Sequence, residues 1–305
     1  MSDSTLRGWE LEELLAHRFS RPLYLCEPIL PSGGRALLHG QPGLGKTQLA
    51  LTLAIAVAQG EDFLGFPCEP GPAAFFQFDM PKELFQDRLR KAFGWEKDAN
   101  LPSLPPIKVV TASYGELVGE WLRKMPEAVE EMREMSPALV VVDSITQTHE
   151  LDENTMEAAK YVYSTFQRLF PDSALLFIHH DRKADGAELM VDQAYSGHNA
   201  WMRPIDIGLH LVGTKKGPLL DFSKVRTEDR SKLVAIPLVM DKDTLLMEPA
   251  GVHAAAYAIL RSNPGISQAE FVKRLVELQI PGGSRPNAYK WWRRLMESNT
   301  KEGQT

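Results

Sequence analysis

The chain has 305 residues, of which 44% are hydrophobic and 24% charged, and its net charge is −6. This length accommodates one large hydrophobic core and a small additional unit, and the composition is that of an ordinary globular protein. The charge is divided unevenly, because residues 251–305 carry eight Lys or Arg and four Glu, a net of +4, which leaves −10 on residues 1–250. That balance excludes a surface that is basic throughout, so we expect any nucleic-acid affinity to be local.

Cysteine content and hydropathy indicate the compartment. Cys26 and Cys68 lack the spacing of a metal site, and we interpret both as small buried hydrophobic residues in a reducing environment. The first fifteen residues are acidic and amphipathic, unlike a secretory signal. The longest apolar stretch is too short to cross a bilayer. We therefore expect a soluble, cytoplasmic protein without a membrane partner.

The first strong signal along the chain is a glycine-rich stretch between a predicted strand and a predicted helix. An amphipathic helix is predicted at residues 9–17, a short strand at 35–39 (RALLH) and a buried helix at 47–59, which ends at Gly60. Between this strand and helix, the residues match the G-x-x-x-x-G-K-[ST] pattern of a phosphate-binding loop. They are Gly40, Gln41, Pro42, Gly43, Leu44, Gly45, Lys46 and Thr47.

This pattern has a direct physical meaning. Glycines allow backbone N–H groups to surround a β-phosphate at the positive end of a helix. Lys46 would contact the β- and γ-phosphates, the Thr47 hydroxyl would ligate Mg²⁺, and we include the adjacent Gln48 in the predicted nucleotide site. The alternative is a chance glycine-rich turn, but the order of strand, loop and helix favours a site for ATP and Mg²⁺.

The next elements alternate between strand and helix. The predicted strands are 73–78 (AAFFQF), 107–111 and 138–142 (ALVVV), and the predicted helices are 82–93 and 121–135. The strand ALVVV runs directly into Asp143, which is the Walker B pattern of a buried strand that presents a carboxylate toward Mg²⁺ or its water shell.

The remaining elements complete one α/β domain. A helix at 153–169 precedes a strand at 174–180 (ALLFIHH), a loop at 181–196 and short strands at 205–212, 218–223, 233–239 and 244–247. This order predicts a P-loop NTPase core with a mostly parallel sheet and an antiparallel extension. We place this domain at residues 1–250 and a second, small helical domain at residues 251–305.

The second domain has three predicted helices, at 254–261, 268–278 and 285–296. Ser267 and Glu270 form a capping box at the start of the second helix. A glycine-bearing turn before the third helix favours a helix-turn-helix or winged-helix module. Contacts to duplex DNA are then expected from Arg285, Lys290, Arg293 and Arg294. The alternative is a small bundle that covers the core, with Trp291 and Trp292 packed inside it.

ATP hydrolysis also needs a carboxylate that orients water and cations that stabilise charge on the γ-phosphate. Asp79 follows the strand AAFFQF and is a candidate for the carboxylate, although it is also suited to cap the helix that Pro81 opens. Lys224 and Arg226 lie on one face of a strand edge. They form either a solvated edge or, in a ring, a pair of cations that reaches the ATP of a neighbouring subunit.

His179 and His180 end the strand ALLFIHH and are candidate sensors of the γ-phosphate. Adjacent residues on a strand point to opposite faces, so we expect only one of them to contact it. A zinc site here would need further ligands, and the nearby residues offer only Asp181, Asp185 and His198. We therefore do not expect these two histidines to bind zinc.

Over residues 20–248 these motifs together resemble the RecA-fold ATPases of the DnaB and RepA type, which are hexameric replicative DNA helicases. The resemblance lies in FFQFDMP, LVVVDS, IHHDRKADG followed by SGHNA, and SKVRT. It implies that Lys46, Thr47 and Asp143 hold the phosphates and Mg²⁺, and that Asp79 stands in place of a catalytic Glu. His179 or His180 would then sense the γ-phosphate.

The resemblance also implies partners. It implies a homo-oligomeric ring, expected to be a hexamer, in which Lys224 and Arg226 act on the neighbouring subunit and single-stranded DNA passes through the centre. Arg182, Lys183 and Arg203 are then the expected contacts to that DNA. Two alternatives stay open: a RecA- or KaiC-like ATPase that binds DNA without unwinding it, and a regulator in which ATP only changes the oligomeric state.

Overall fold

The structure is a computed structural model, and it describes residues 8–18, 23–95, 103–112, 123, 125–153, 155–181, 199–226, 233, 235–263, 265–278, 288 and 292. Its strands are β1 (Tyr24–Cys26), β2 (Leu30–Pro31), β3 (Arg35–Gly40), β4 (Ala73–Gln77), β5 (Ile107–Thr111), β6 (Leu139–Asp143), β7 (Ala174–His180), β8 (Ile207–Thr214), β9 (Gly217–Val225), β10 (Ile236–Met240) and β11 (Met247–Pro249). Its helices are α1 (Leu11–Ala16), α2 (Lys46–Gln59), α3 (Lys82–Ala92), α5 (Pro126–Glu134), α6 (Met156–Leu169), α7 (Asn199–Met202), α8 (Val252–Ser262) and α9 (Gln268–Glu277), with a 3₁₀ turn at Ile145–Thr148.

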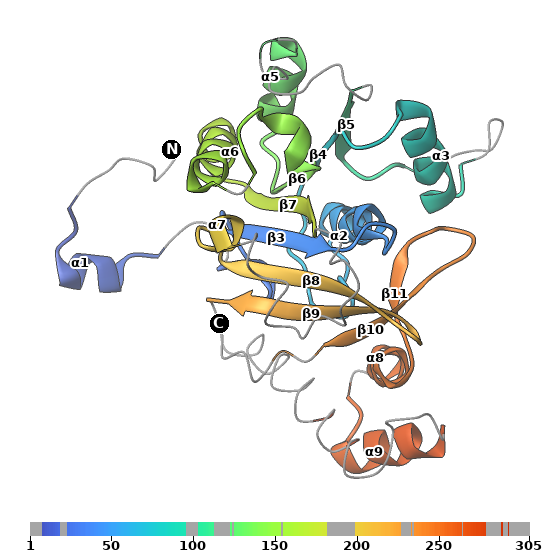
Figure 1. Cartoon of the computed structure of the whole chain (residues 1–305). Coiled ribbons are helices and arrows are strands. Elements are labelled where there is room, and N and C mark those ends of the chain that lie inside the picture. The colour runs from blue at the N-terminus through green and yellow to red at the C-terminus, as the bar shows by residue number, and fades with distance from the viewer. Residues whose placement is uncertain are drawn as a thin grey trace.

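One large sheet organises the chain (Figure 1). Within the described residues it has nine strands in the order β11-β10-β9-β8-β3-β7-β6-β4-β5. The strands from β8 to β5 are mutually parallel, whereas β9, β10 and β11 continue the sheet in antiparallel fashion. The predicted α/β fold, with a mostly parallel sheet and an antiparallel extension, is therefore confirmed.

Helices cover both faces of this sheet, which explains why its central strands are apolar throughout. β4 and β6 are buried along their whole length, as expected of parallel strands covered on both sides. On β3, Ala36 and Leu38 join the core under α2 and α3, whereas Leu37 joins a second core under α5, α6 and α7. The P-loop strand thus lies in the middle of three layers.

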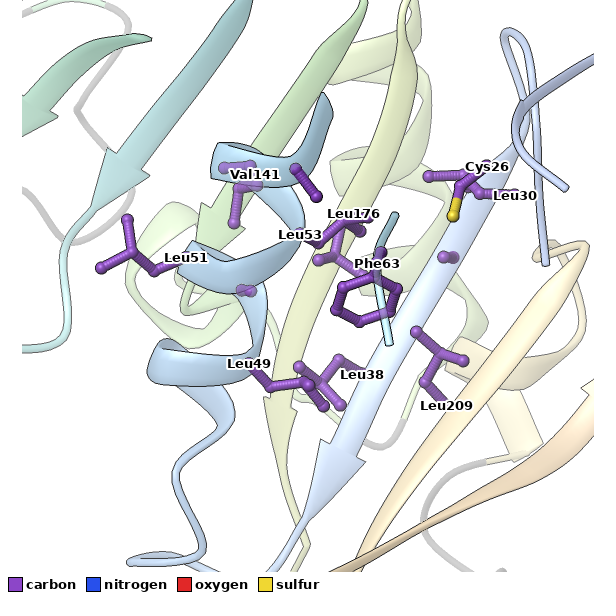
Figure 2. Packing of buried hydrophobic residues seen from close by; sticks show 14 of the residues in the cluster. Cys26, Leu30, Leu38, Leu49, Leu51, Leu53, Phe63, Val141, Leu176 and Leu209 are labelled. Carbon is purple, nitrogen blue, oxygen red and sulfur yellow. The ribbon is translucent and has the colours of Figure 1, made fainter. Parts of the chain in front are cut away.

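Helix α2 is the most deeply buried helix beside the sheet. Figure 2 shows Leu49 and Leu53 of α2 gathered in one cluster with Leu38 of β3 and Leu176 of β7. The helix ends where Gly60 adopts a left-handed conformation with φ of 67°, as the sequence predicts. Nearly every side of α2 packs against protein, so this helix holds the P-loop in a fixed place.

Two predicted elements differ from the structure. The helix expected at residues 121–135 is described as α5, which starts at Pro126, and proline is favourable in the first turn because that N–H has no partner within the helix. The strand expected at residues 244–247 is instead β11 at Met247–Pro249. Residues 241–246 form a turn, because the Asp241 carboxylate accepts hydrogen bonds from the backbone and hydroxyl of Thr244.

The C-terminal helices have a hydrophobic cluster of their own. Phe271 of α9 lies at its centre and contacts Trp292, with ring centroids 5.2 Å apart. Ser267 caps α9 as predicted, but Glu270 pairs with Arg274 at 2.9 Å. The domain boundary at residue 250 stays a prediction. Of the third helix expected at residues 285–296, only Ala288 and Trp292 are described, so Arg285, Lys290, Arg293 and Arg294 lie outside the described residues.

No helix in the described part of the chain combines the length and the hydrophobicity that a membrane span requires. The short helix α1 buries none of its residues.

Candidate functional site

The candidate site lies where the carboxyl ends of β3, β7, β6 and β4 meet. Gly40 of β3 is paired in register with His180 of β7, and Gln77 of β4 with Asp143 of β6. In open parallel sheets, ligands bind at this edge because loops from several strands converge there. The register brings the predicted P-loop, Walker B and sensor residues to one edge.

The P-loop needs glycine at Gly40 and Gly45 for conformational and steric reasons. Gly45 has φ of 90° and directly precedes α2, which leaves the first N–H groups of the helix facing outward. Gly40 has φ of 149°, and a Cβ there would lie 2.2 Å from the carbonyl oxygen of Leu211. Gly43 also has a positive φ, of 81°, but a Cβ there would meet nothing within 4 Å.

We expect Gly40→Ala to destabilise the fold more than Gly43→Ala. Both substitutions force alanine into an unfavourable conformation, which costs about 1–2 kcal/mol. Only Gly40→Ala adds a clash with the backbone of β8, which cannot move aside as a side chain can. Denaturant unfolding of the two variants measures the difference, and equal stability would contradict the proposed packing of β3 against β8.

Lys46 is buried within its own loop. Its Nζ donates hydrogen bonds to the carbonyl oxygens of Gly40 (2.7 Å) and Gln41 (2.9 Å). Burial disfavours the charged amine and lowers its pKa to about 8, although the carboxylates of Asp181 and Asp143 act in the opposite direction. The side chain is therefore held at the loop, where a β- or γ-phosphate would replace the carbonyl oxygens as its partner.

This burial predicts a pH-dependent difference in stability. Because the pKa of Lys46 is lower in the folded state than in an exposed lysine, the unfolded chain binds more protons between about pH 8 and 10.5. The free energy of unfolding of the wild type should therefore increase by about 2 kcal/mol as the pH rises through that window. This increase should be absent in Lys46→Met. Unfolding of the nucleotide-free proteins from pH 7 to 10 measures it, with Lys91→Met, on the exposed face of α3, as the control.

Thr47, Asp143 and Gln77 form the centre of the site. The Thr47 hydroxyl donates to Asp143 Oδ2 (2.6 Å), and the Gln77 amide donates to the same oxygen (2.8 Å). The other carboxylate oxygen, Asp143 Oδ1, is buried without a hydrogen-bond partner among the described residues. Burial raises the pKa of Asp143 to about 6.

These features fit a magnesium ion. A buried carboxylate oxygen without a partner, beside a hydroxyl at the first turn of α2, offers the hard oxygen ligands that Mg²⁺ prefers. Thr47 and Asp143 are the residues that would hold the ion, directly or through its water shell. When bound there, Mg²⁺ would neutralise part of the negative charge of the phosphates.

Gln77 is a site residue that the sequence analysis missed. Its amide oxygen accepts hydrogen bonds from the backbone N–H of Asp79 (2.6 Å) and Met80 (3.2 Å), while its amide nitrogen donates to Asp143. One side chain therefore positions both carboxylates of the site. The signal was present, because Gln77 is an amide inside the otherwise apolar run AAFFQF, and buried polar groups need partners.

Asp79 and His180 face each other beside this centre. The His180 Nε2 lies 3.4 Å from Asp79 Oδ2, and Ser144 donates to Asp79 Oδ1 at 3.4 Å. The contact with His180 is the main cause that lowers the pKa of Asp79, which keeps the carboxylate ionised. About one third of each side chain is exposed.

The structure separates the two adjacent histidines. His180 lies at the nucleotide site beside Asp79, whereas His179 packs on the opposite side of the strand against Trp201, with ring centroids 5.6 Å apart. Of the two candidate sensors, His180 is the one beside Asp79 at the edge of the sheet where the P-loop begins.

Gln48 contacts a residue that the sequence did not indicate. When the Gln48 amide is oriented with its oxygen toward Arg88 of α3, it accepts hydrogen bonds from that guanidinium at 3.0 and 3.1 Å. This contact connects the helix that follows Asp79 to the first turn after the P-loop.

Lys224 lies near the end of β9, and Arg226 follows the strand on the same side, as expected. Both lie near the amino end of β3, at the opposite edge of the sheet from the P-loop. Both donate to the carbonyl oxygen of Arg203, at 2.9 and 2.8 Å, and Arg226 also pairs with Asp206 at 3.5 Å. The side chain of Arg203 is exposed at the same place. Arg182 and Lys183 lie outside the described residues.

A P-loop at the end of a central parallel strand, with Lys46, Thr47 and the facing Asp143 in position, defines a RecA-fold P-loop ATPase. The chain belongs to the AAA domain family, whose model matches residues 2–186. Similar solved structures include a KaiC-like protein from the hyperthermophilic archaeon Pyrococcus horikoshii OT3. That match has 18% sequence identity and a TM-score of 0.50, and it covers 74% of this chain and 94% of the other. This likeness concerns the fold.

Proposed function

We propose that this chain is an ATP-driven DNA motor that assembles into a ring, expected to be a hexamer, and acts as a replicative DNA helicase on single-stranded DNA. ATP would lie between subunits, with Asp79 orienting the attacking water and His180 contacting the γ-phosphate. The observation that supports this proposal most directly is the position of Arg226 relative to the P-loop.

Arg226 is placed too far from its own P-loop to act there. Its backbone N–H bonds to Asp206, whose own N–H bonds to Arg35 at the start of β3, whereas the P-loop follows Gly40 at the end of that strand. Five residues along a strand correspond to roughly 16 Å. An arginine side chain cannot span this distance, so any action of Arg226 on ATP requires a second subunit.

A head-to-tail assembly provides that geometry. In such an assembly each subunit contacts its neighbour through two different surfaces, and a ring results if the rotation closes. The edge of the sheet that carries the P-loop in one subunit would then face the edge that carries Lys224 and Arg226 in the next subunit. Lys224 and Arg226 form a pair of cations suited to the charge that develops on a transferred phosphoryl group.

We propose DNA as the substrate of the motor because the exposed Arg203 lies beside Lys224 and Arg226 and adds a further positive charge there. We assign Arg182, Lys183 and Arg203 to single-stranded DNA, and Arg285, Lys290, Arg293 and Arg294 to duplex DNA. The charge of −10 on residues 1–250 means that such contacts must be confined to few sites.

Unwinding and ATP turnover should be measured together. We expect ATP hydrolysis that increases with single-stranded DNA, opening of a forked duplex, and loss of both in Lys46→Ala. Light scattering with a non-hydrolysable ATP analogue and a single-stranded oligonucleotide gives the subunit number. An assembled, active ATPase that leaves the fork closed would contradict the helicase and favour a DNA-binding ATPase that does not unwind. A helical filament would contradict the closed ring.

A further inference from the structure

A second cluster of buried ionisable side chains lies next to the nucleotide site, on the face of the sheet away from α2. His39 belongs to β3, His210 to β8, and Asp181 directly follows β7. Their exposed fractions are 1%, 9% and 8%. The three residues are far apart in the sequence, and the parallel register of β3 with both neighbouring strands brings them together.

The spacing of the ligand atoms is that of a metal site. His39 Nδ1 lies 3.2 Å and 3.4 Å from the two oxygens of Asp181, and His210 Nε2 lies 3.4 Å from Asp181 Oδ2. These distances are at or beyond the upper end of ordinary N–H···O hydrogen bonds. They match the separation of roughly 3.3 Å between neighbouring ligands of a tetrahedral ion with bonds of about 2.0–2.1 Å. One ligand atom from each residue lies within 4.8 Å of the others.

Further contacts orient the histidine rings. The Ser223 hydroxyl of β9 lies 3.0 Å from His39 Nε2, which directs the other ring nitrogen toward Asp181. Hydrogen bonds of this kind fix the orientation of metal-ligating histidines. The rings of His39 and His210 are stacked at 4.4 Å and 7° from parallel, so they must tilt toward a common point to share an ion.

We propose that His39, Asp181 and His210 bind one divalent transition-metal ion, with Zn²⁺ as the best match. Two imidazoles and one carboxylate suit zinc, whereas Mg²⁺ and Ca²⁺ prefer ligands that are all oxygen. A water molecule would supply the fourth ligand, as in other zinc sites with three protein ligands. The site is distinct from the magnesium ligands Thr47 and Asp143.

The position of the site suggests what the ion does. His39 directly precedes Gly40, and the backbone N–H of Asp181 donates to the Gly40 carbonyl at 3.1 Å. That same carbonyl accepts from Lys46. Ser223, which contacts His39, directly precedes Lys224. An ion here would therefore connect β3, β7 and β8 beneath the P-loop, and the proposal does not depend on helicase activity.

Metal binding to the intact, untagged chain tests this directly. The protein is treated with a chelator, kept free of nucleotide, and titrated with Zn²⁺ in competition with a chromophoric chelator. We expect one equivalent per chain. Co²⁺ in place of Zn²⁺ should give visible absorption of a nitrogen- and oxygen-ligated ion, without the charge-transfer bands of thiolate ligands.

Variants locate the site. His210→Gln and Asp181→Asn should each weaken Zn²⁺ binding by more than about 100-fold, and Ser223→Ala by about tenfold, because it only orients a ligand. Two control variants should bind zinc as the wild type does. His149→Gln changes a buried histidine outside the cluster, and Cys68→Ser changes a free thiol whose backbone pairs with that of Cys26. Thermal unfolding without metal shows whether each variant is folded.

Three results would overturn the proposal. Binding of less than one equivalent by the wild type would remove the site. Unchanged affinity in both ligand variants would place the ion elsewhere, and loss of binding in Cys68→Ser would assign it to the thiol pair. If a ligand variant fails to fold, the Co²⁺ spectrum of the wild type and the affinity of Ser223→Ala still decide the question.

Discussion

Replacing Arg226 by alanine is expected to lower the ATP turnover of the assembled protein by about 10³-fold or more, the effect typical of a cation supplied by a neighbouring subunit. Nucleotide affinity should change little, because Arg226 lies at the end of the sheet away from its own P-loop. Steady-state turnover and equilibrium nucleotide binding, both at protein concentrations that maintain the assembly, measure the two effects. About half of the Arg226 side chain is exposed.

Mixing two inactive variants distinguishes action between subunits from action within one. Lys46→Ala lacks the phosphate-binding amine but keeps Arg226, whereas Arg226→Ala keeps Lys46. In a mixed ring of equal parts, about a quarter of the interfaces join an intact P-loop to an intact Arg226. Turnover should therefore reappear on mixing. A mixture as inactive as its components would contradict the shared site, and Asp206→Asn controls for the loss of the ion pair within the subunit.

Replacing Asp79 by asparagine is expected to lower turnover by about 10²–10⁴-fold, the range for loss of a group that accepts a proton. Binding of ATP should persist, because Asp79 contacts His180 and Ser144 and makes no hydrogen bond to the P-loop residues that the structure describes. The same Gln77 contacts that hold its backbone should remain in the variant. Single-turnover hydrolysis and nucleotide binding by the same preparation separate the two properties.

Two further variants serve as controls for Asp79→Asn. Asp79→Glu extends the carboxylate by one methylene and should retain turnover, because a carboxylate that can accept a proton is still present at this position. Asp87→Asn, which removes an exposed carboxylate of α3 paired with Lys91, should behave as the wild type. Full turnover in Asp79→Asn would exclude Asp79 as the residue that activates water.

The local parts of the site were readable from the sequence because each is a short motif within one strand–loop unit. The P-loop, the end of β6 at Asp143 and the end of β7 at His180 all lie where their motifs indicate. These strands run parallel to one another, so their carboxyl ends lie at the same edge of the sheet, and this explains why the three motifs meet. The order of the strands was not predicted, because apolar strands do not specify their neighbours.

Contacts between distant residues were not predictable in the same way. Gln77 was read as part of a buried strand, and only the structure shows that its amide bonds both Asp143 and the backbone of Asp79. His39 and His210 lie 171 residues apart and share no recognisable spacing. The strand expected at residues 244–247 was wrong because the Asp241 carboxylate stabilises a turn there.

The close packing around α2 restricts how nucleotide chemistry is transmitted. A helix embedded on nearly all sides cannot tilt or slide without opening voids, and interiors at crystalline density resist such deformation. We therefore expect loss of a phosphate to be conveyed by contacts at the ends of the helix, such as the one between Gln48 and Arg88, while the centre of the domain stays rigid. We infer that the stability of this domain and its response to nucleotide depend on different residues.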